Sequence, residues 1–306
     1  MIRFLYNRLW QSIATLFAII TVTFWIIQAA PGGPFQSERA VSPHIREQML
    51  AAYGLDRPPF AQYTHYLGNL LKGDFGLTTK YEGWTVLEII GGAFPISLQL
   101  GLLGMAFALT LGLPVGIIAA ARKNSAADWL PMSISMLGIC LPTFVMGPLL
   151  ALGLGLNLNL FNVAGWYGWS DRVLPSLTLG LFYAAYIARM TRAGMLEVLS
   201  RDFVRTARAK GLPDRTVVYK HALRVAILPV ITYLGPLAAH LLTGSIVVET
   251  VFNIPGAGGF FVHSILNRDG FLLGGVVIIY CALLIVFNLL VDASYALLDR
   301  RIRVDA

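Results

Sequence analysis

The sequence predicts an all-α polytopic membrane protein with about six transmembrane helices. Only 13% of the 306 residues are charged and 57% are hydrophobic, whereas an ordinary soluble domain has about 25% charged residues. Several uncharged runs also reach the length of about 20 apolar residues that a membrane-spanning helix needs. The net charge of +7 raises the possibility of a nucleic-acid-binding protein. We exclude that class because the positive residues lie in patches beside the apolar runs.

The first predicted span covers residues 9–30 and follows Arg3 and Arg8. Its uncharged run continues to Ser37, whereas a cleaved secretory signal has an apolar core of only about 7–15 residues. We therefore interpret residues 1–30 as a retained N-terminal anchor helix.

Residues 31–95 are more polar and predict a partly helical extracytoplasmic region. Ser42-Pro43 is typical of a helix start, with Gly54 as the stop. The helical spacing of aromatic and leucine residues predicts a second helix over residues 59–72. Thr85 and Glu88 match a capping box before the next apolar run. The region is too short to form a large core of its own, so we expect it to pack on the membrane domain.

The membrane core is predicted over residues 96–300, followed by a cytoplasmic tail at 301–306. Its spans are expected at about 96–120, 129–156, from 173 into a basic segment, 225–248 and 271–297. Gly112 and Gly116 form a GxxxG pattern on the first of these, which permits close helix approach. Arg189 and Arg192 are expected to snorkel to the lipid headgroups.

Charge predicts the orientation of the chain. With the N-terminus inside, 16 Lys and Arg residues fall on the inner side and 7 on the outer side. The positive-inside rule then places both termini in the cytoplasm.

A basic elbow interrupts the apolar pattern between the fourth and fifth spans. Residues 189–224 contain nine Lys or Arg against three acidic residues. The break around Gly211 and Pro213 predicts two short helices that meet at an angle, the first with Ser200 as its N-cap. Phe203, Val204 and Ala207 are expected on one side of that helix and Arg201, Arg205 and Arg208 on the other. The elbow is either a solvated cytoplasmic loop or a docking element for a cytoplasmic partner.

Motifs for catalysis or metal binding are absent from the sequence. It has no GxxxxGK[ST] phosphate loop, HExxH or CxxC pair, and Cys140 and Cys281 lie within apolar runs. We expect no catalytic residue, metal site or cofactor. His240 falls inside the fifth span, either on a transport pathway or hydrogen-bonded to a neighbouring helix. The spans carry few other ionisable groups, so the energy for any transport is expected to come from another subunit.

Four stretches resemble the inner-membrane permease subunits of ABC importers, and more narrowly their peptide/nickel branch. They are Ala30-Pro31-Gly32, residues 53–76, residues 205–212 with 220–230, and residues 249–269. They cover nearly the whole chain in the right order. The chain departs from the family's EAA-type coupling motif at Arg205, which replaces a Glu, and at Thr206, which replaces the first Ala.

The resemblance implies a type I ABC importer permease fold in a bacterial inner membrane. It implies a coupling segment within residues 197–224 that docks on the ATPase. The residues expected to make this contact are Arg205, Thr206, Ala207, Arg208, Ala209, Lys210, Gly211, Leu212 and Pro213. The expected partners are a second homologous permease, two cytoplasmic ATPases that bind ATP and magnesium, and an extracytoplasmic peptide-binding protein.

The expected substrate is an oligopeptide, with a dipeptide or a nickel chelate as alternatives and a self-contained secondary carrier as the runner-up class. Pro229, Gly235 and Pro236 interrupt the fifth span and are expected to act as a gate or hinge. The loop at 249–269 is expected at the external mouth of the pathway, or else serves as a packed connector. Its turn-forming and polar residues are Glu249, Asn253, Pro255, Gly256 and Gly258.

Overall fold

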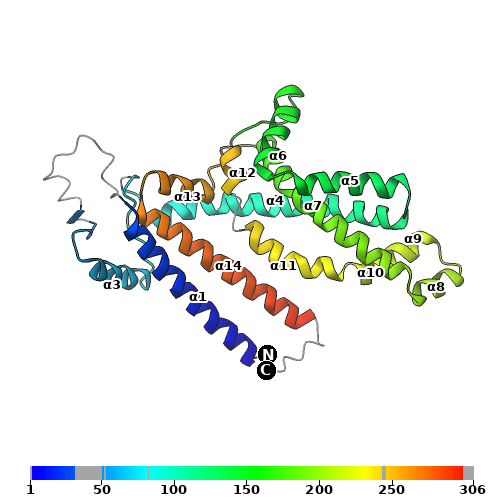
Figure 1. Cartoon of the computed structure of the whole chain (residues 1–306), viewed down its shortest axis with the longest axis horizontal. Coiled ribbons are helices and arrows are strands. Elements are labelled where there is room, and N and C mark those ends of the chain that lie inside the picture. The colour runs from blue at the N-terminus through cyan, green and yellow to red at the C-terminus, as the bar shows by residue number, and fades with distance from the viewer. Residues whose placement is uncertain (1, 32–49, 52, 82, 243–245, 299–306) are drawn as a thin grey trace. The chain divides into compact units, whose positions relative to one another are not determined.

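The computed structural model describes residues 2–31, 50–51, 53–81, 83–242 and 246–298 (Figure 1). Helices form nearly all of the regular structure in these ranges, with one isolated antiparallel bridge between Leu77 and Thr85. The chain divides into two compact units, Met1–Ile96 with Pro255–Ala306, and Ser97–Ile254. The expected helix start at Ser42-Pro43 lies outside the described residues.

Within these described ranges, four helices are long and apolar enough to cross a membrane: α1 (Ile2–Ala29), α4 (Val86–Ala121), α7 (Trp169–Leu199) and α14 (Gly270–Leu298). Two further pairs of bent helices pass the same test, which brings the number to as many as six. The prediction of a helical protein with about six spans is confirmed.

In the first unit, α1 packs along α14, and the two helices lie side by side in Figure 1. The helix that the periodicity predicts is present as α3 (Pro59–Leu70), and it contacts α1. The Tyr63 hydroxyl is 2.8 Å from that of Thr21. The rings of Tyr63 and Tyr66 lie 5.3 and 5.8 Å from the ring of Phe24. These aromatic contacts hold the polar region against a membrane helix.

Local hydrogen bonds fix the starts of α4 and α14. The predicted capping box is present: the Thr85 amide donates to Glu88, and the Glu88 amide donates to the Thr85 hydroxyl. Asp269 caps α14 by accepting from the Leu272 amide, and it also accepts from the amides of Thr79 and Lys80. Burial raises the pKa of Asp269, while these amide donors favour its charged form.

In the second unit, α7 is the central helix. Its neighbours include α5 (Ala126–Cys140), α6 (Thr143–Leu150), α10 (Leu223–Ala226), α11 (Leu228–Leu242) and α12 (Ile246–Val251). The Ser97–Ala121 part of α4 packs against it through glycines. A Cβ at Gly112 would lie 2.7 Å from the Ala184 carbonyl oxygen, and one at Gly116 would lie 2.5 Å from that of Ala188. The close approach predicted from the GxxxG pattern is confirmed.

Two predicted spans are broken rather than continuous. The span expected at 129–156 bends by 112° between α5 and α6, and then continues as a π-helix, η1 (Ala151–Asn157). The bend falls at Leu141, which is extended (φ −84°, ψ 118°) because it precedes Pro142. The span expected at 225–248 bends by 51° at Ile227, directly before Leu228-Pro229.

Candidate coupling site

The elbow is built from short helices that follow α7. After α7 ends at Leu199, α8 (Asp202–Ala209) is followed by a turn, α9 (Asp214–Thr216) and the π-helix η2 (Val217–Ala222), which continues into α10. Arg201 is the N-cap of α8, so the prediction of Ser200 in that role is wrong. The Ser200 hydroxyl donates instead to the Glu197 carbonyl oxygen, 2.7 Å away at the end of α7.

Gly211 makes the turn between α8 and α9 possible. Its φ of +76° lies in the left-handed region, where a residue with a Cβ is strained. This confirms the positive φ expected just past a helix end. A Cβ at Gly211 would meet no atom of the chain within 4 Å. The turn therefore requires glycine for its backbone conformation and not because of crowding within the chain.

The inner face of the elbow is apolar and packed. On α8, Val204 is fully buried and Ala207 is 6% exposed. They belong to one cluster with residues of η2 and with α4 and α7 residues: Val217, Val218, Ala222, Ile117, Ala120, Met195 and Val198. Burial of a valine side chain contributes about 1.5–3 kcal/mol at most. This cluster fixes the orientation of α8 on the second unit.

Phe203, which was expected on the same side of α8 as Val204 and Ala207, is not buried with them. Its side chain is 42% exposed, because a helix turns by about 100° between successive residues and the contact is centred on Val204 and Ala207. Leu212, in the turn, is also 37% exposed. Two apolar side chains thus stand among the cations on the outside of the elbow.

The outer face carries the basic residues, three of them in exposed ion pairs. Arg201 contacts Glu197 at 2.5 Å, Arg205 contacts Asp202 at 3.6 Å, and Arg208 contacts Asp214 at 3.4 Å. The last pair joins α8 to α9 across the Gly211 turn. Pairs as exposed as these contribute about 0–1 kcal/mol each, so they leave the cations available to a partner.

The structure brings the nine predicted coupling residues together in one continuous segment. Eight of them are exposed and only Ala207 is buried. The segment therefore presents a helix, a turn and a mixed basic and apolar surface to the outside, held from behind by the apolar cluster. Such a surface is suited to binding another protein.

An ion pair that sequence reasoning missed lies beside the elbow. Asp128, in the first turn of α5, accepts from Arg192 of α7 at 2.5 Å (Nε) and 2.8 Å (Nη2), and from the Asn124 amide at 3.0 Å. The Asp128 side chain is only 4% exposed. The guanidinium of Arg192, which was expected to snorkel to the headgroups, is held by this carboxylate. Asp128 is the only acidic residue between Glu88 and Asp171, a signal that a cationic partner was needed.

The predicted hinge residues lie along α11. Pro229 stands in its first turn, next to the 51° bend, whereas Gly235 and Pro236 lie inside the helix, which continues through them. Pro229 and Pro236 are both exposed. Their role as a gate stays a prediction.

The residues predicted at the external mouth do not form one site within either unit. The segment is largely helical, with α12 and α13 (Ala257–Leu266), so its description as a loop is wrong. Glu249 and Asn253 belong to the second unit, and Pro255, Gly256 and Gly258 to the first. Asn253 and Pro255 are exposed, whereas Glu249, Gly256 and Gly258 are buried.

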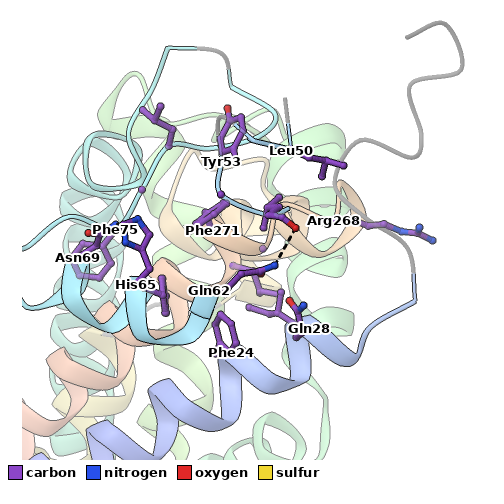
Figure 2. A pocket seen from close by; sticks show the side chains of 18 of the residues that line it. Phe24, Gln28, Leu50, Tyr53, Gln62, His65, Asn69, Phe75, Arg268 and Phe271 are labelled. Atoms are coloured by element: carbon purple, nitrogen blue, oxygen red, sulfur yellow. Dashed lines mark hydrogen bonds between the residues drawn. The ribbon is translucent and has the colours of Figure 1, made fainter. Parts of the chain in front are cut away.

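The first unit also contains a cavity of about 690 Å³ that the sequence did not indicate (Figure 2). Its walls come from α1, α3, the chain around residues 74–77, and the adjoining parts of α13 and α14. Phe24 and Phe271 supply aromatic surface, and Gln62 donates to the Arg57 carbonyl at 2.8 Å. No group of His, Cys, Asp and Glu side chains that could hold a metal ion occurs in the described part of the chain.

Two family descriptions match the chain. Residues 112–304 match "Binding-protein-dependent transport system inner membrane component", and residues 1–98 match the N-terminal region of such membrane components. Together they include the elbow, the hinge helix and the polar region between α1 and α4.

Known relatives are similar over their full lengths. The oligopeptide transport system permease protein OppB of Haemophilus influenzae is 45% identical over 99% of this chain and 100% of its own. OppB of Salmonella typhimurium is 42% identical over the same shares. The dipeptide transport system permease protein DppB of Bacillus subtilis is 41% identical over 99% of each chain.

Solved structures share the fold. The MetNI methionine ABC transporter in an inward-facing conformation matches with a TM-score of 0.60 and 17% identity, over 70% of this chain and 98% of the other. An amino acid ABC transporter with histidines matches with a TM-score of 0.54 and 17% identity, over 69% and 94%. The expected type I importer fold is confirmed.

Proposed function

Because the chain belongs to the family of inner-membrane components of binding-protein-dependent transport systems, we propose that it is the permease subunit of an ATP-driven importer of oligopeptides. With a second permease it forms the pathway, and two cytoplasmic ATPases bind and hydrolyse ATP with magnesium. An extracytoplasmic binding protein delivers the peptide. Both termini and the elbow lie on the cytoplasmic side, as the distribution of positive charge indicates.

The observation that carries the proposal is the two-sided elbow. Its inner face is fixed to α4 and α7 by the apolar cluster, while its outer face exposes Phe203 and Leu212 among basic residues. A solvated loop requires neither a packed inner face nor apolar side chains on its outer surface. A docking helix needs both, since it must transmit displacement and must bury apolar groups in its partner.

The geometry also supports a route for coupling. The elbow is continuous with α7 on one side and with α10 and α11 on the other. Movement of an ATPase against α8 therefore reaches two membrane helices directly. In the proposed alternating-access cycle, ATP-driven closure of the ATPases brings the elbows together and opens the pathway outward.

The peptide class of substrate is supported by the names of full-length relatives. Relatives named for oligopeptides and for dipeptides are about equally similar, so a dipeptide importer is the second candidate. A self-contained carrier is disfavoured, because the family is described as dependent on binding proteins and the described spans hold few ionisable groups.

Purification and reconstitution test the proposal. The chain is expected to co-purify with a second permease and two ATPase subunits. Vesicles that contain this complex should take up alanine peptides only with ATP and the binding protein. Uptake compared across lengths of two to six alanines distinguishes the dipeptide candidate. Uptake by the single chain without ATP would contradict the proposed function.

A further inference from the structure

The exposed surface of α11 carries both apolar and polar side chains. Leu228 and Ile231 are 56% and 40% exposed and form an apolar sector. Thr232, Pro236 and His240 are also exposed and follow Leu228 at four-residue spacing, in a row that turns away from Ile231 and forms a polar sector. The Thr232 hydroxyl donates to the Leu228 carbonyl oxygen at 3.0 Å. The part of this surface around Leu228 and Ile231 is therefore suited to lipid or to an apolar partner, and the part around His240 is not.

Tyrosines continue the polar sector onto α7. The ring of Tyr183 lies 6.1 Å from that of His240 in an edge-on contact. Tyr233 of α11, which is half-buried, lies close enough to Tyr183 and Tyr186 for their phenol groups to interact electrostatically. Phe182 packs at a tilt on Tyr186, with the ring centres 5.3 Å apart. The two helices thus share one surface of aromatic rings and hydroxyl groups.

An exposed histidine beside tyrosines within membrane spans belongs on a water-filled path or at a protein interface, because ionisable side chains in spans face the bundle interior or a water-filled cavity. We propose that Tyr186, Thr232, Tyr233 and His240 line the translocation pathway and contact the backbone of the peptide in transit. This inference rests on the proposed function and names the part of the chain that meets the substrate.

The chemistry of these groups fits a peptide backbone. Hydroxyl groups both donate and accept hydrogen bonds, which matches the alternating amide and carbonyl groups of any peptide. Aromatic rings offer apolar surface to side chains without strict shape selection. The absence of a fixed charge among the four residues suits a path that must accept side chains of either sign.

Cysteine accessibility tests the inference in the assembled complex. The parent is the complex with both native cysteines replaced, Cys140→Ser and Cys281→Ser, reconstituted with its binding protein and shown to take up tri-alanine. Thr232→Cys and His240→Cys are then compared with Ile231→Cys, the control in the apolar sector. A small water-soluble methanethiosulfonate should label the first two variants, and tri-alanine under turnover should slow that labelling at least fivefold. Labelling of Ile231→Cys should be slow and insensitive to peptide.

Removal of single hydroxyl groups supplies a second readout. Tyr186→Phe and Tyr233→Phe should each lower the maximal uptake rate of tri-alanine about two- to tenfold, the range that one hydrogen bond supplies. Subunit composition and the affinity of the separate binding protein for tri-alanine should be unchanged, which separates a pathway contact from a folding defect.

The outcomes distinguish this inference from the proposed function. If the parent complex transports tri-alanine but Thr232→Cys and His240→Cys are unlabelled, unprotected by peptide or cross-linked to the second permease, the pathway assignment alone is wrong. Unchanged uptake in both Tyr→Phe variants would overturn it as well. If the parent complex transports no peptide under any condition, the proposed function fails and the inference fails with it.

Discussion

At the residue scale, substitutions of Gly211 distinguish the effect of backbone strain from the effect of a close contact with the ATPase. Its φ is +76°, and a Cβ added there would have no atom of the chain within 4 Å, so a substitution strains the turn without an internal clash. We expect Gly211→Val to cost about 1–2 kcal/mol of local stability, and Gly211→Asn less, since Asn tolerates this region better. Both variants should insert and retain the second permease.

The readout for Gly211 is the ratio of peptide taken up to ATP hydrolysed by the reconstituted complex. Gly211→Val is expected to lose the ATPases or to uncouple hydrolysis from uptake. Gly211→Asn should fall between it and the parent if strain dominates, and should match Gly211→Val if the ATPase contacts this residue closely. Parent-like coupling in both variants would show that the turn has no role in coupling.

The exposed cations of the elbow are expected to matter less individually. Arg205 pairs with Asp202 across 3.6 Å, with side chains 75% and 97% exposed, and such pairs contribute about 0–1 kcal/mol. Arg205→Ala and Lys210→Ala should each retain the ATPases, with coupling reduced less than in Gly211→Val. The same uptake-to-hydrolysis ratio checks this order, and a complete loss in either single variant would assign that cation a dominant contact.

At the element scale, the pair of Asp128 and Arg192 joins α5 to α7. Asp128→Ala leaves the guanidinium of Arg192, whose side chain is 29% exposed, without its carboxylate, and we expect it to destabilise the chain by about 1.5–3 kcal/mol. Glu197→Gln, at the exposed pair with Arg201, is the matched control and should cost no more than about 1 kcal/mol. Melting temperatures of the purified complex in detergent give the comparison, and equal values for the two variants would refute a structural role for the buried pair.

The hinge assignment is an expectation about α11. Pro236 supplies no amide donor to the hydrogen-bond ladder of a helix that otherwise continues through it. Pro236→Ala should therefore alter uptake more than subunit assembly. Pro229→Ala, beside the 51° bend, should have the larger effect because it changes the junction with the elbow. Parent-like uptake and ATP turnover in both variants would make these prolines packing features.

Helices and caps with local sequence signals could be predicted from the sequence. The positions at which a predicted span is broken could not. The periodic tyrosines of α3 and the capping box at Thr85 involve neighbours within four residues, so pattern sufficed. The predicted third span contains Pro131, Pro142 and Pro148, of which the first and last lie inside helices and only Pro142 ends one. Which proline breaks a span depends on the packing around it.

The position of the candidate site in the chain could be predicted from the sequence, but the packing and ion pairs that hold it in place could not. The charge run and Gly211 located the elbow, because both are properties of the chain itself. The orientation of Phe203 and the partner of Arg192 depend on α4, α5 and α7, which approach from distant parts of the sequence. The polar sector of α11 was visible only as a lone His240 until the tyrosines of α7 were placed beside it.

At the scale of the whole molecule, the elbow and the segment around Asn253 must lie on opposite sides of the membrane for the proposed function. Asn253 is exposed in the turn after α12, and the positive-inside rule predicts that this turn lies outside. In the complex without native cysteines, Asn253→Cys should react with an impermeant thiol reagent added from outside intact cells. Reaction only after the inner side is opened would reverse the proposed topology.

Cross-linking of the elbow to the ATPases during transport tests the central claim most directly. Ala209 is exposed on α8, so Ala209→Cys in the complex without native cysteines should cross-link to an ATPase subunit through a short reagent that forms a disulfide with the new thiol and an amide with a nearby lysine of the ATPase. Asn253→Cys is the control and should not. Cross-linking should stop ATP-dependent uptake of tri-alanine, and reduction of the cross-link should restore it. A complex that transports tri-alanine while Ala209→Cys never cross-links to an ATPase would contradict the role of the elbow in coupling.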